Sequence, residues 1–200
     1  MPTKAILFDI DGVLIITPKF YSHIHAEEHS IEASQIEPFF KGEFRQATVG
    51  KADLKQLLDK HRELWAWDDP VEELMERWFK AESNVDHQLL ALIRQLRANG
   101  IRCYIATDQE KYRAAYLREL FKGQFDDMFV SCEIGLEKQD PEFFKVALRK
   151  LKKTIPDITP GDVTYFDDSP KKVESAAQSG IRSIHYTNRS QVTQLLPAHH

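Results

Sequence analysis

The amino-acid sequence predicts an α/β fold: a doubly wound, Rossmann-like parallel sheet with a small α-helical cap inserted after the first strand. Short apolar runs alternate with helical patterns over most of the 200 residues, which is typical of a parallel sheet covered by helices. One long stretch, residues 18–84, breaks this alternation because it contains helical patterns and no convincing strand. The length also fits one α/β domain with an insertion.

Five short runs predict the strands. They are residues 5–8, 101–106, 128–130, 163–166 and 181–186. The first, second and fourth runs are mostly apolar rather than alternating, as expected of parallel strands that are buried on both faces. We therefore expect one parallel sheet whose crossovers are right-handed.

Four helices are expected between and after these strands. They lie near residues 86–99, 110–121, 141–153 and 171–179. Gly100 and Gly180 stand where helix ends need a positive φ. Asp140-Pro141 and Ser169-Pro170 each predict an N-cap residue followed by proline at the first helical position.

Residues 18–84 are too many for a simple crossover, which needs a dozen or so residues. Leu54, Leu57 and Leu58 have helical spacing, and Asp69-Pro70-Val71-Glu72 predicts an N-cap, an N1 proline and an N3 glutamate that open another helix. We interpret residues 18–84 as a helical cap packed over the sheet's edge. Residues 1–17 and 85–200 then form the core domain.

Composition excludes several classes of protein. Hydrophobic residues make up 42% of the chain and charged residues 29%, which predicts a water-soluble globule. No apolar run approaches the ~18 residues of a membrane span, and the run at 5–8 is too short for a secretory signal. The net charge of -4 gives no general attraction to nucleic acid or to a membrane surface. We expect a monomer or weak dimer.

Two cysteines, Cys103 and Cys132, lack CxxC spacing and form no disulfide framework, so we expect a cytoplasmic protein with two inert buried thiols. His25 and His29 are four residues apart, and we prefer solvated cap histidines to metal ligands. His199-His200 is the kind of pair that an expression tag leaves, and it is excluded from functional reasoning. Aromatic residues of residues 18–84 are expected in the cap core, with one or two lining a substrate pocket: Phe39, Phe40, Phe44, Trp65, Trp67 and Trp78.

Polar residues follow the predicted strands, where ligands bind in open α/β sheets. They are Asp9 and Asp11 after the first strand, Thr107 and Asp108 after the second, Lys138 in the loop after the third, and Asp167 and Asp168 after the fourth. Clustered carboxylates repel one another without a cation, and hard oxygen ligands suit Mg²⁺. Thr107 and Lys138 supply donors for an anionic group. The combination predicts metal-assisted phosphoryl transfer with a carboxylate nucleophile.

These residues, in this order, resemble the four motifs of the haloacid dehalogenase-like superfamily. The matching segments are Phe8-Asp9-Ile10-Asp11-Gly12-Val13, Ile105-Ala106-Thr107, Gly135-Leu136-Glu137-Lys138-Gln139-Asp140-Pro141 and Phe166-Asp167-Asp168-Ser169. The helical stretch between the first two motifs is similar to the cap of the subfamily with an N-terminal α-helical cap. The resemblance therefore spans essentially the whole chain.

The resemblance implies a role for each matching residue. Asp9 is the expected nucleophile that becomes an aspartyl-phosphate, and Asp11 the general acid and base. Thr107 and Lys138 are expected to hold the phosphoryl oxygens, with backbone N–H groups near Ile10, Asp11 and Asp108 completing the phosphate cradle. The Asp9 carboxylate, the Asp11 backbone carbonyl and Asp168 are the expected Mg²⁺ ligands. Asp167 is expected to act on the metal through water or to orient Lys138.

Two positions depart from the common pattern of the superfamily. Position 108 is often Asn in relatives, and position 139 is often Pro, whereas this chain has Asp108 and Gln139. Asp108 adds a negative charge near the predicted phosphate site. Either its side chain faces away, or a lysine or arginine, a substrate hydroxyl or a proton must compensate it. A polyhydroxylated substrate supplies such a hydroxyl, which favours sugar phosphates.

The leading functional hypothesis is a Mg²⁺-dependent phosphatase acting on a small phosphorylated metabolite. The cap resembles those of sugar-phosphate phosphatases, including α-glucose 1-phosphate phosphatases. A phosphoglucomutase-like isomerase and a catalytically degenerate binding protein are the alternatives. Asp11 argues against the haloacid dehalogenase reaction, whose enzymes lack this second aspartate, and the order of the acidic residues argues against a receiver domain.

Overall fold

The computed structural model describes residues 3–196 and is built around a five-stranded parallel sheet. Its strands are β1 (Ala5–Phe8), β2 (Arg102–Thr107), β3 (Asp127–Val130), β4 (Val163–Asp167) and β5 (Arg182–His185). The order is β3-β2-β1-β4-β5, and every neighbouring pair is parallel. Because the order reverses on either side of central β1, the predicted doubly wound α/β sheet is confirmed. The pair His199-His200 lies outside the described residues.

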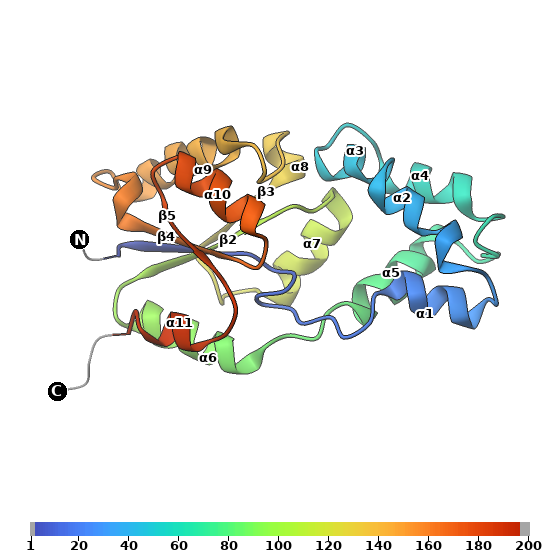
Figure 1. Ribbon diagram of the computed structural model, residues 1–200, viewed down its shortest axis with the longest axis horizontal. Helices are drawn as coiled ribbons and strands as arrows, with labels where there is room; N and C mark the ends of the chain where they lie inside the picture. Colours follow the sequence, from blue (N-terminus) through green and yellow to red (C-terminus); the bar gives the residue numbers. More distant parts are fainter. Residues whose placement is uncertain (1–2, 197–200) are drawn as a thin grey trace.

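Helices cover both faces of the sheet (Figure 1). Ile6 and Phe8 of β1 pack on the face covered by α6 (His87–Ala98), α7 (Lys111–Leu120) and α11 (Ser190–Thr193). Ala5 and Leu7 pack on the other face, against α9 (Pro141–Thr154) and α10 (Pro170–Gln178). All four β1 side chains are fully buried, which explains why this strand is an unbroken apolar run.

The predicted helix boundaries hold at most ends. Gly100 and Gly180 have φ of +83° and +79°, and the Asp140 side chain accepts a hydrogen bond from the Glu142 N–H at the start of α9. The predicted capping box at 69–72 is wrong. Pro70, not Asp69, is the N-cap residue of α5 (Val71–Ala81), because its backbone stays extended at ψ 145°.

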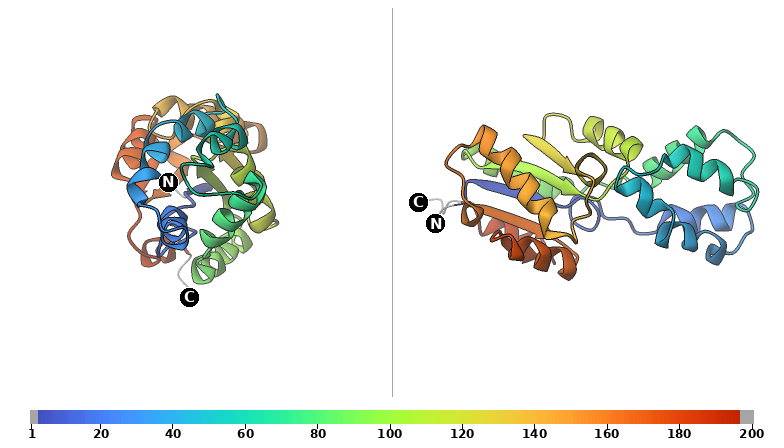
Figure 2. Two further views of the ribbon diagram at one scale, coloured as in Figure 1. Left: turned by 90° about the vertical axis from the view of Figure 1, so that its right-hand side faces the viewer. Right: turned by 90° about the horizontal axis from the view of Figure 1, so that it is seen from above.

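The elements between β1 and α6 are all helical, and they are called the cap from here on. Its elements are α1 (Tyr21–Glu28), a 3₁₀ turn (Ala33–Gln35), α2 (Glu37–Lys41), α3 (Phe44–Thr48), α4 (Leu54–His61) and α5. They bury a hydrophobic cluster of their own that includes Leu54, Trp65 and Met75. Figures 1 and 2 show the cap beyond the carboxyl ends of the strands, so this is the edge of the sheet over which it packs.

Two connections join the cap to the sheet, and they run side by side. Ile15 pairs with Val85 in an antiparallel bridge. The Ile16 N–H donates to the Asn84 carbonyl at 2.9 Å, and Asn84 Nδ2 donates to the Ile16 carbonyl at 3.0 Å. The chain therefore enters and leaves the cap at one place, next to the end of β1. Within residues 3–196, no helix has both the length and the apolar character needed to cross a membrane.

Candidate active site

The ends of three neighbouring strands bring the predicted site residues together. Asp9 directly follows β1, Thr107 ends β2 and Asp167 ends β4. Because β1 lies between β2 and β4, these three side chains converge, and all three are buried. Lys138 reaches them from the loop between α8 (Ser131–Ile134) and α9, and its side chain is fully buried as well.

Lys138 lies at the centre of this group. Its Nζ is 2.5 Å from Asp9 Oδ1 and 2.8 Å from Asp167 Oδ2, and it donates to the Ala106 carbonyl at 3.1 Å. The Tyr165 hydroxyl donates to Asp167 Oδ2, and the Ser169 N–H donates to Asp167 Oδ1 at 2.8 Å. Asp167 is thus fixed on both oxygens and holds Lys138 against Asp9.

The two carboxylates that share Lys138 have opposite pKa shifts. Burial is the largest influence on Asp9 and raises its pKa to about 7, although Lys138 acts in the other direction. Burial also raises the pKa of Asp167, but the charges of Lys138 and Lys172 outweigh it and leave that pKa below its ordinary value. Lys138 thus pairs with both carboxylates, and burial is the reason that the pKa of Asp9 stays high despite this pair.

Three carboxylates fit a divalent cation. Asp9, Asp167 and Asp168 each offer an oxygen within 4.8 Å of the others. Asp168 is the exposed member, and burial and Asp167 raise its pKa. Gly12, with φ of +82°, lies so close to Asp168 that a β-carbon at residue 12 would stand 2.2 Å from Asp168 Oδ2. This set of hard oxygen donors suits Mg²⁺.

Asp11 lies apart from this cluster. Its side chain is exposed, accepts a hydrogen bond from Gln109 Nε2 at 2.7 Å and lines the cleft between the sheet and the cap. Gln109 is itself buried and follows β2 in the chain. The Asp11 carboxylate is therefore held toward the cleft by a neutral amide rather than drawn into the acidic cluster.

Thr107 and Asp108 differ in how their side chains are used. Thr107 Oγ1 is buried and has no hydrogen-bond partner among residues 3–196. This hydroxyl, next to the end of β1, is therefore free to donate or accept a hydrogen bond. Asp108 Oδ1 accepts a hydrogen bond from the Lys138 N–H at 2.8 Å, and Asp108 Oδ2 lies 3.3 Å from Lys172 Nζ. Of the compensations expected for Asp108, the structure has the lysine partner.

Lys172 was missed by reasoning from sequence. It lies in the first turn of α10, shortly after Asp167 and Asp168, and 22% of its side chain is exposed. Burial lowers its pKa, but the charges of Asp9, Asp108 and Asp167 outweigh burial and raise that pKa above the ordinary value. The signal in the sequence was the lysine pair that follows Ser169-Pro170, which reads as an ordinary exposed helix start.

A cleft of about 570 Å³ separates the strand ends from the cap. Asp11, Asp108 and Gln109 line it from the core, and aromatic side chains line it from the cap: Phe20, Phe40, Phe44 and Trp78. The rings of the last three pack together, with centroids 5.3–5.6 Å apart. Phe20, which was not among the predicted aromatics, is the most exposed of the four at 59%.

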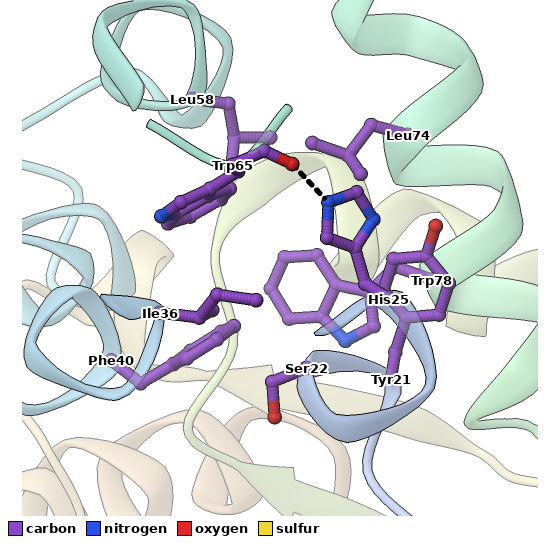
Figure 3. A pocket seen from close by; sticks show the side chains of 9 residues that line it. All are labelled: Tyr21, Ser22, His25, Ile36, Phe40, Leu58, Trp65, Leu74 and Trp78. Carbon is purple, nitrogen blue, oxygen red and sulfur yellow. Dashed lines mark hydrogen bonds between the residues drawn. The ribbon is translucent and has the colours of Figure 1, made fainter. Parts of the chain in front are cut away.

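His25 corrects one prediction. It is buried rather than solvated, and its Nε2 lies 2.8 Å from the Trp65 carbonyl (Figure 3). The ring stacks on His29 at 4.2 Å and borders a cavity of about 20 Å³ inside the cap. The spacing of the two histidines did not reveal the tryptophans that enclose them, because Trp65 and Trp67 lie far along the chain. Cys103 is buried as predicted, whereas Cys132 is only half-buried, which corrects the prediction of two buried thiols; burial raises the pKa of both.

Polar contacts join the cap to the core around the cleft. Arg45 of α3 pairs with Glu137, next to Lys138, at 3.1 and 2.5 Å. The Ser131 hydroxyl donates to the Thr48 carbonyl at 2.6 Å. Further along the same cap segment, Asp53 lies 2.5 Å from Lys111 Nζ and accepts a hydrogen bond from Tyr112 Oη at 2.9 Å. Residues 45–53 therefore hold the cap to the core next to α7 and α8.

Comparison with known proteins identifies one matching family. Residues 3–180 match the model of the haloacid dehalogenase-like hydrolases. A phosphorylated carbohydrates phosphatase of Thermotoga maritima is 25% identical over 189 residues, which cover 91% of this chain and 84% of that protein.

Solved structures share the fold. A HAD-like family hydrolase from Porphyromonas gingivalis superposes with a TM-score of 0.76 at 18% identity and covers both chains fully. A HAD family enzyme from Bacteroides thetaiotaomicron, in complex with magnesium and inorganic phosphate, gives a TM-score of 0.74 at 20% identity over 91% of this chain and 93% of that one.

Proposed function

The chain belongs to the haloacid dehalogenase-like hydrolase family, and from this we propose that it is a Mg²⁺-dependent phosphatase that hydrolyses a small phosphate monoester through an aspartyl-phosphate. The family match confirms the resemblance drawn from the four motifs. One observation carries the proposal: the buried Asp9 carboxylate lies beside Lys138, the free hydroxyl of Thr107 and the acidic cluster. A nucleophile, phosphate donors and cation ligands are thus combined in one site.

Asp9 is proposed to attack the phosphorus of the bound monoester. Its Oδ1 is held by the Ile10 N–H at 2.8 Å and by Lys138, so the carboxylate has a fixed direction. Thr107 Oγ1 is free to donate to a phosphoryl oxygen, and donors that are already in place stabilise the charge of the transition state without reorganisation. The carboxylate nucleophile splits the hydrolysis into two easier steps.

The proposed cation ligands are the carboxylates of Asp9 and Asp168 and the backbone carbonyl of Asp11. Asp167 is proposed to act on the cation through water. When Mg²⁺ is bound there, it offsets the negative charge of the phosphoryl oxygens. Asp167 has a second proposed role, which is to orient Lys138 through the 2.8 Å ion pair.

Asp11 is proposed to move the proton in both half-reactions. In the first it donates a proton to the leaving alcohol oxygen, and in the second it removes a proton from the water that attacks the aspartyl-phosphate. Its position on the cleft, held by Gln109, supports this role because a leaving group must lie in the cleft. The cap is proposed to exclude bulk water during both steps and to select the substrate.

A sugar phosphate is the first candidate substrate, because the Thermotoga maritima relative is named for phosphorylated carbohydrates. The division into a core of residues 1–17 and 85–200 and a cap of residues 18–84 is part of this proposal. A cytoplasmic location and a monomer or weak dimer stay predictions.

The test is a phosphate-release screen over sugar, nucleotide and lipid-derived monoesters, with and without Mg²⁺. We expect release that requires Mg²⁺ and is fastest on one class of ester. Transfer of the phosphoryl group to a second hydroxyl of the sugar, without release, would instead indicate a phosphoglucomutase-like isomerase. No reaction with any ester, together with retained phosphate binding, would indicate a binding protein.

A further inference from the structure

The Lys138 ammonium has little hydrogen-bonding capacity left for a substrate. Three oxygens surround its Nζ at 2.5–3.1 Å, from Asp9, Asp167 and Ala106. An ammonium carries three hydrogens, and Lys138 donates hydrogen bonds to Asp167 and to the Ala106 carbonyl, while Asp9 is its ion-pair partner. A phosphoryl group bound at Asp9 therefore finds at most one free hydrogen on Lys138, and a second cationic donor would be needed for its other oxygens.

Lys172 is the second lysine whose charge acts on Asp9, and the topology brings it toward the end of β1. Lys172 follows β4 and Asp108 follows β2, while β1 lies between these two strands. The ion pair between Lys172 Nζ and Asp108 Oδ2, at 3.3 Å, thus spans the end of β1, which is where Asp9 stands. Both side chains keep some exposure, 22% for Lys172 and 17% for Asp108, and Asp108 is one of the residues that line the cleft.

The contacts of Lys172 leave hydrogens free. Among the residues that the structure describes, its ammonium has one ion-pair partner, Asp108, whereas Lys138 has two. The strand ends carry five carboxylates, Asp9, Asp11, Asp108, Asp167 and Asp168, and the lysines that pair with some of them are Lys138 and Lys172. A phosphate dianion that enters such an acidic site meets repulsion, and a cation with unused donors reduces it.

We infer that Lys172 is a phosphate-binding residue: it donates to an oxygen of the phosphoryl group at Asp9, and Asp108 holds the ammonium in position. This inference rests on the proposed phosphatase function. It also gives Asp108 a purpose, because a neutral Asn at this position would not anchor a cation. In this ion pair the negative charge of Asp108, which alone would repel phosphate, serves to position a second lysine.

A simpler role is that Lys172 only neutralises Asp108 and never contacts phosphate. The two roles differ when Asp108 is also neutralised. If Lys172 only cancels that charge, the double variant Asp108→Asn with Lys172→Met binds phosphate as the wild type does. If Lys172 donates to phosphate, the double variant stays weak.

The experiment measures binding of inorganic phosphate and of orthovanadate to the full chain by calorimetry, at saturating Mg²⁺. The variants are Lys172→Met, Lys172→Arg, Asp108→Asn with Lys172→Met, and Lys171→Met as a matched control. Lys171 is the exposed neighbour in the same helix turn, so its variant removes the same charge outside the site. Circular dichroism melting of each variant checks the fold, and Lys172→Arg, which retains the charge, provides the comparison if Lys172→Met is unstable.

We expect Lys172→Met to weaken phosphate and vanadate binding about 10- to 100-fold, as the loss of one charge-assisted hydrogen bond does. Lys171→Met should stay within about 2-fold of the wild type, Lys172→Arg should retain most of the affinity, and the double variant should remain at least about 5-fold weaker than the wild type. Equal effects of Lys171→Met and Lys172→Met, or full recovery in the double variant, overturn the inference.

The proposed function fails separately from this inference. If the wild type binds phosphate through Lys172 but releases no phosphate from any ester, the phosphatase proposal is wrong and the phosphate site remains supported. If the wild type hydrolyses esters and Lys172→Met binds phosphate with unchanged affinity, the phosphatase proposal remains supported and the role of Lys172 in phosphate binding is wrong.

Discussion

Gly12 and Asp168 are in contact at the end of the sheet, and the contact leaves no room for a side chain at residue 12. A β-carbon there would stand 2.2 Å from Asp168 Oδ2 and 2.5 Å from Asp168 Cγ. The positive φ of Gly12, +82°, is also one that side chains rarely adopt. The glycine therefore allows the loop after β1 to approach a proposed cation ligand from β4.

Gly12→Ala should therefore reduce activity by displacing Asp168. We expect a loss of at least about 10-fold in kcat/KM and a higher Mg²⁺ concentration for half-maximal rate, because a displaced ligand typically costs that much in metal affinity or activity. Gly123→Ala is the matched control, since Gly123 has a φ of +75° and open space around it. Both variants should melt lower by a similar amount, and an unchanged Mg²⁺ dependence of Gly12→Ala would contradict the role of Asp168.

Asp9→Asn should abolish phosphate release while the protein stays folded. The amide is a poor nucleophile, and the swap preserves the size of the side chain in a fully packed site. The rate is measured by phosphate release at saturating Mg²⁺, and beryllofluoride binding should be seen for the wild type only. Release by Asp9→Asn at more than a few per cent of the wild-type rate would falsify the nucleophile assignment.

The same substitution should change how stability depends on pH in metal-free protein. The pKa of Asp9 rises from 3.8 to about 7 on folding, so the folded state holds this proton more tightly. The contribution of Asp9 to stability is then present at low pH and lost as the pH rises toward about 7. The free energy of unfolding of the wild type should fall relative to that of Asp9→Asn between about pH 4 and 7, by on the order of a few kcal/mol.

Urea denaturation of both proteins in the presence of a chelator measures this difference. The comparison removes the effects of other buried acids, such as Glu82 and Glu110, because both proteins contain them. Addition of Mg²⁺ should abolish the difference between the two proteins in how the free energy of unfolding changes with pH. A wild type that gains stability relative to Asp9→Asn over this range would show that the folded state prefers the ionised carboxylate.

Asp11→Asn should lower kcat by roughly 10²–10⁴-fold if Asp11 is the general acid and base. Mg²⁺ binding should persist, since the Asp11 carboxylate lies outside the acidic cluster. Gln109→Leu removes the 2.7 Å hydrogen bond to Asp11 and should reduce kcat less, with a shifted pH–rate profile. Equal loss of Mg²⁺ affinity and of rate in Asp11→Asn would instead make this side chain a metal ligand.

Phe20→Ala should change substrate choice without changing stability. Phe20 is 59% exposed and lines the cleft, so it is available to a leaving group and contributes little to the core. We expect KM to rise several-fold for an aryl phosphate, because burying an aromatic surface against a ligand is favourable. Leu64→Ala is the control, since Leu64 is a 49% exposed cap residue away from the cleft lining. Equal KM values for both variants would exclude Phe20 from the substrate site.

The sequence predicted the sheet and the placement of the site because both depend on local patterns. Fully buried strands read as apolar runs, and the polar residues that follow them must meet where parallel strands end. Lys138 was found in this way even though its burial between two carboxylates leaves no mark in composition.

The contacts that the sequence did not reveal join residues distant in the chain. The partner of Asp108 is Lys172 of α10. The polar residues at the start of that helix predict an exposed turn, so they do not indicate that one of its lysines turns toward Asp108. The burial of His25 depends on Trp65, which only the folded cap brings near. The capping box at 69–72 failed because a proline after Asp69 kept the backbone extended for one more residue.

The central position of β1 has a consequence for synthesis on the ribosome. The first strand to emerge pairs with β2 and β4, whose first residues are Arg102 and Val163. Its apolar run is therefore unpaired until β2 follows the cap, and it is paired along one edge only until β4 is translated. The cap has a hydrophobic cluster drawn largely from contiguous sequence and can form during that interval. A nascent chain arrested before β4 thus carries a formed cap beside an exposed strand, and such a species is where chaperones are expected to act.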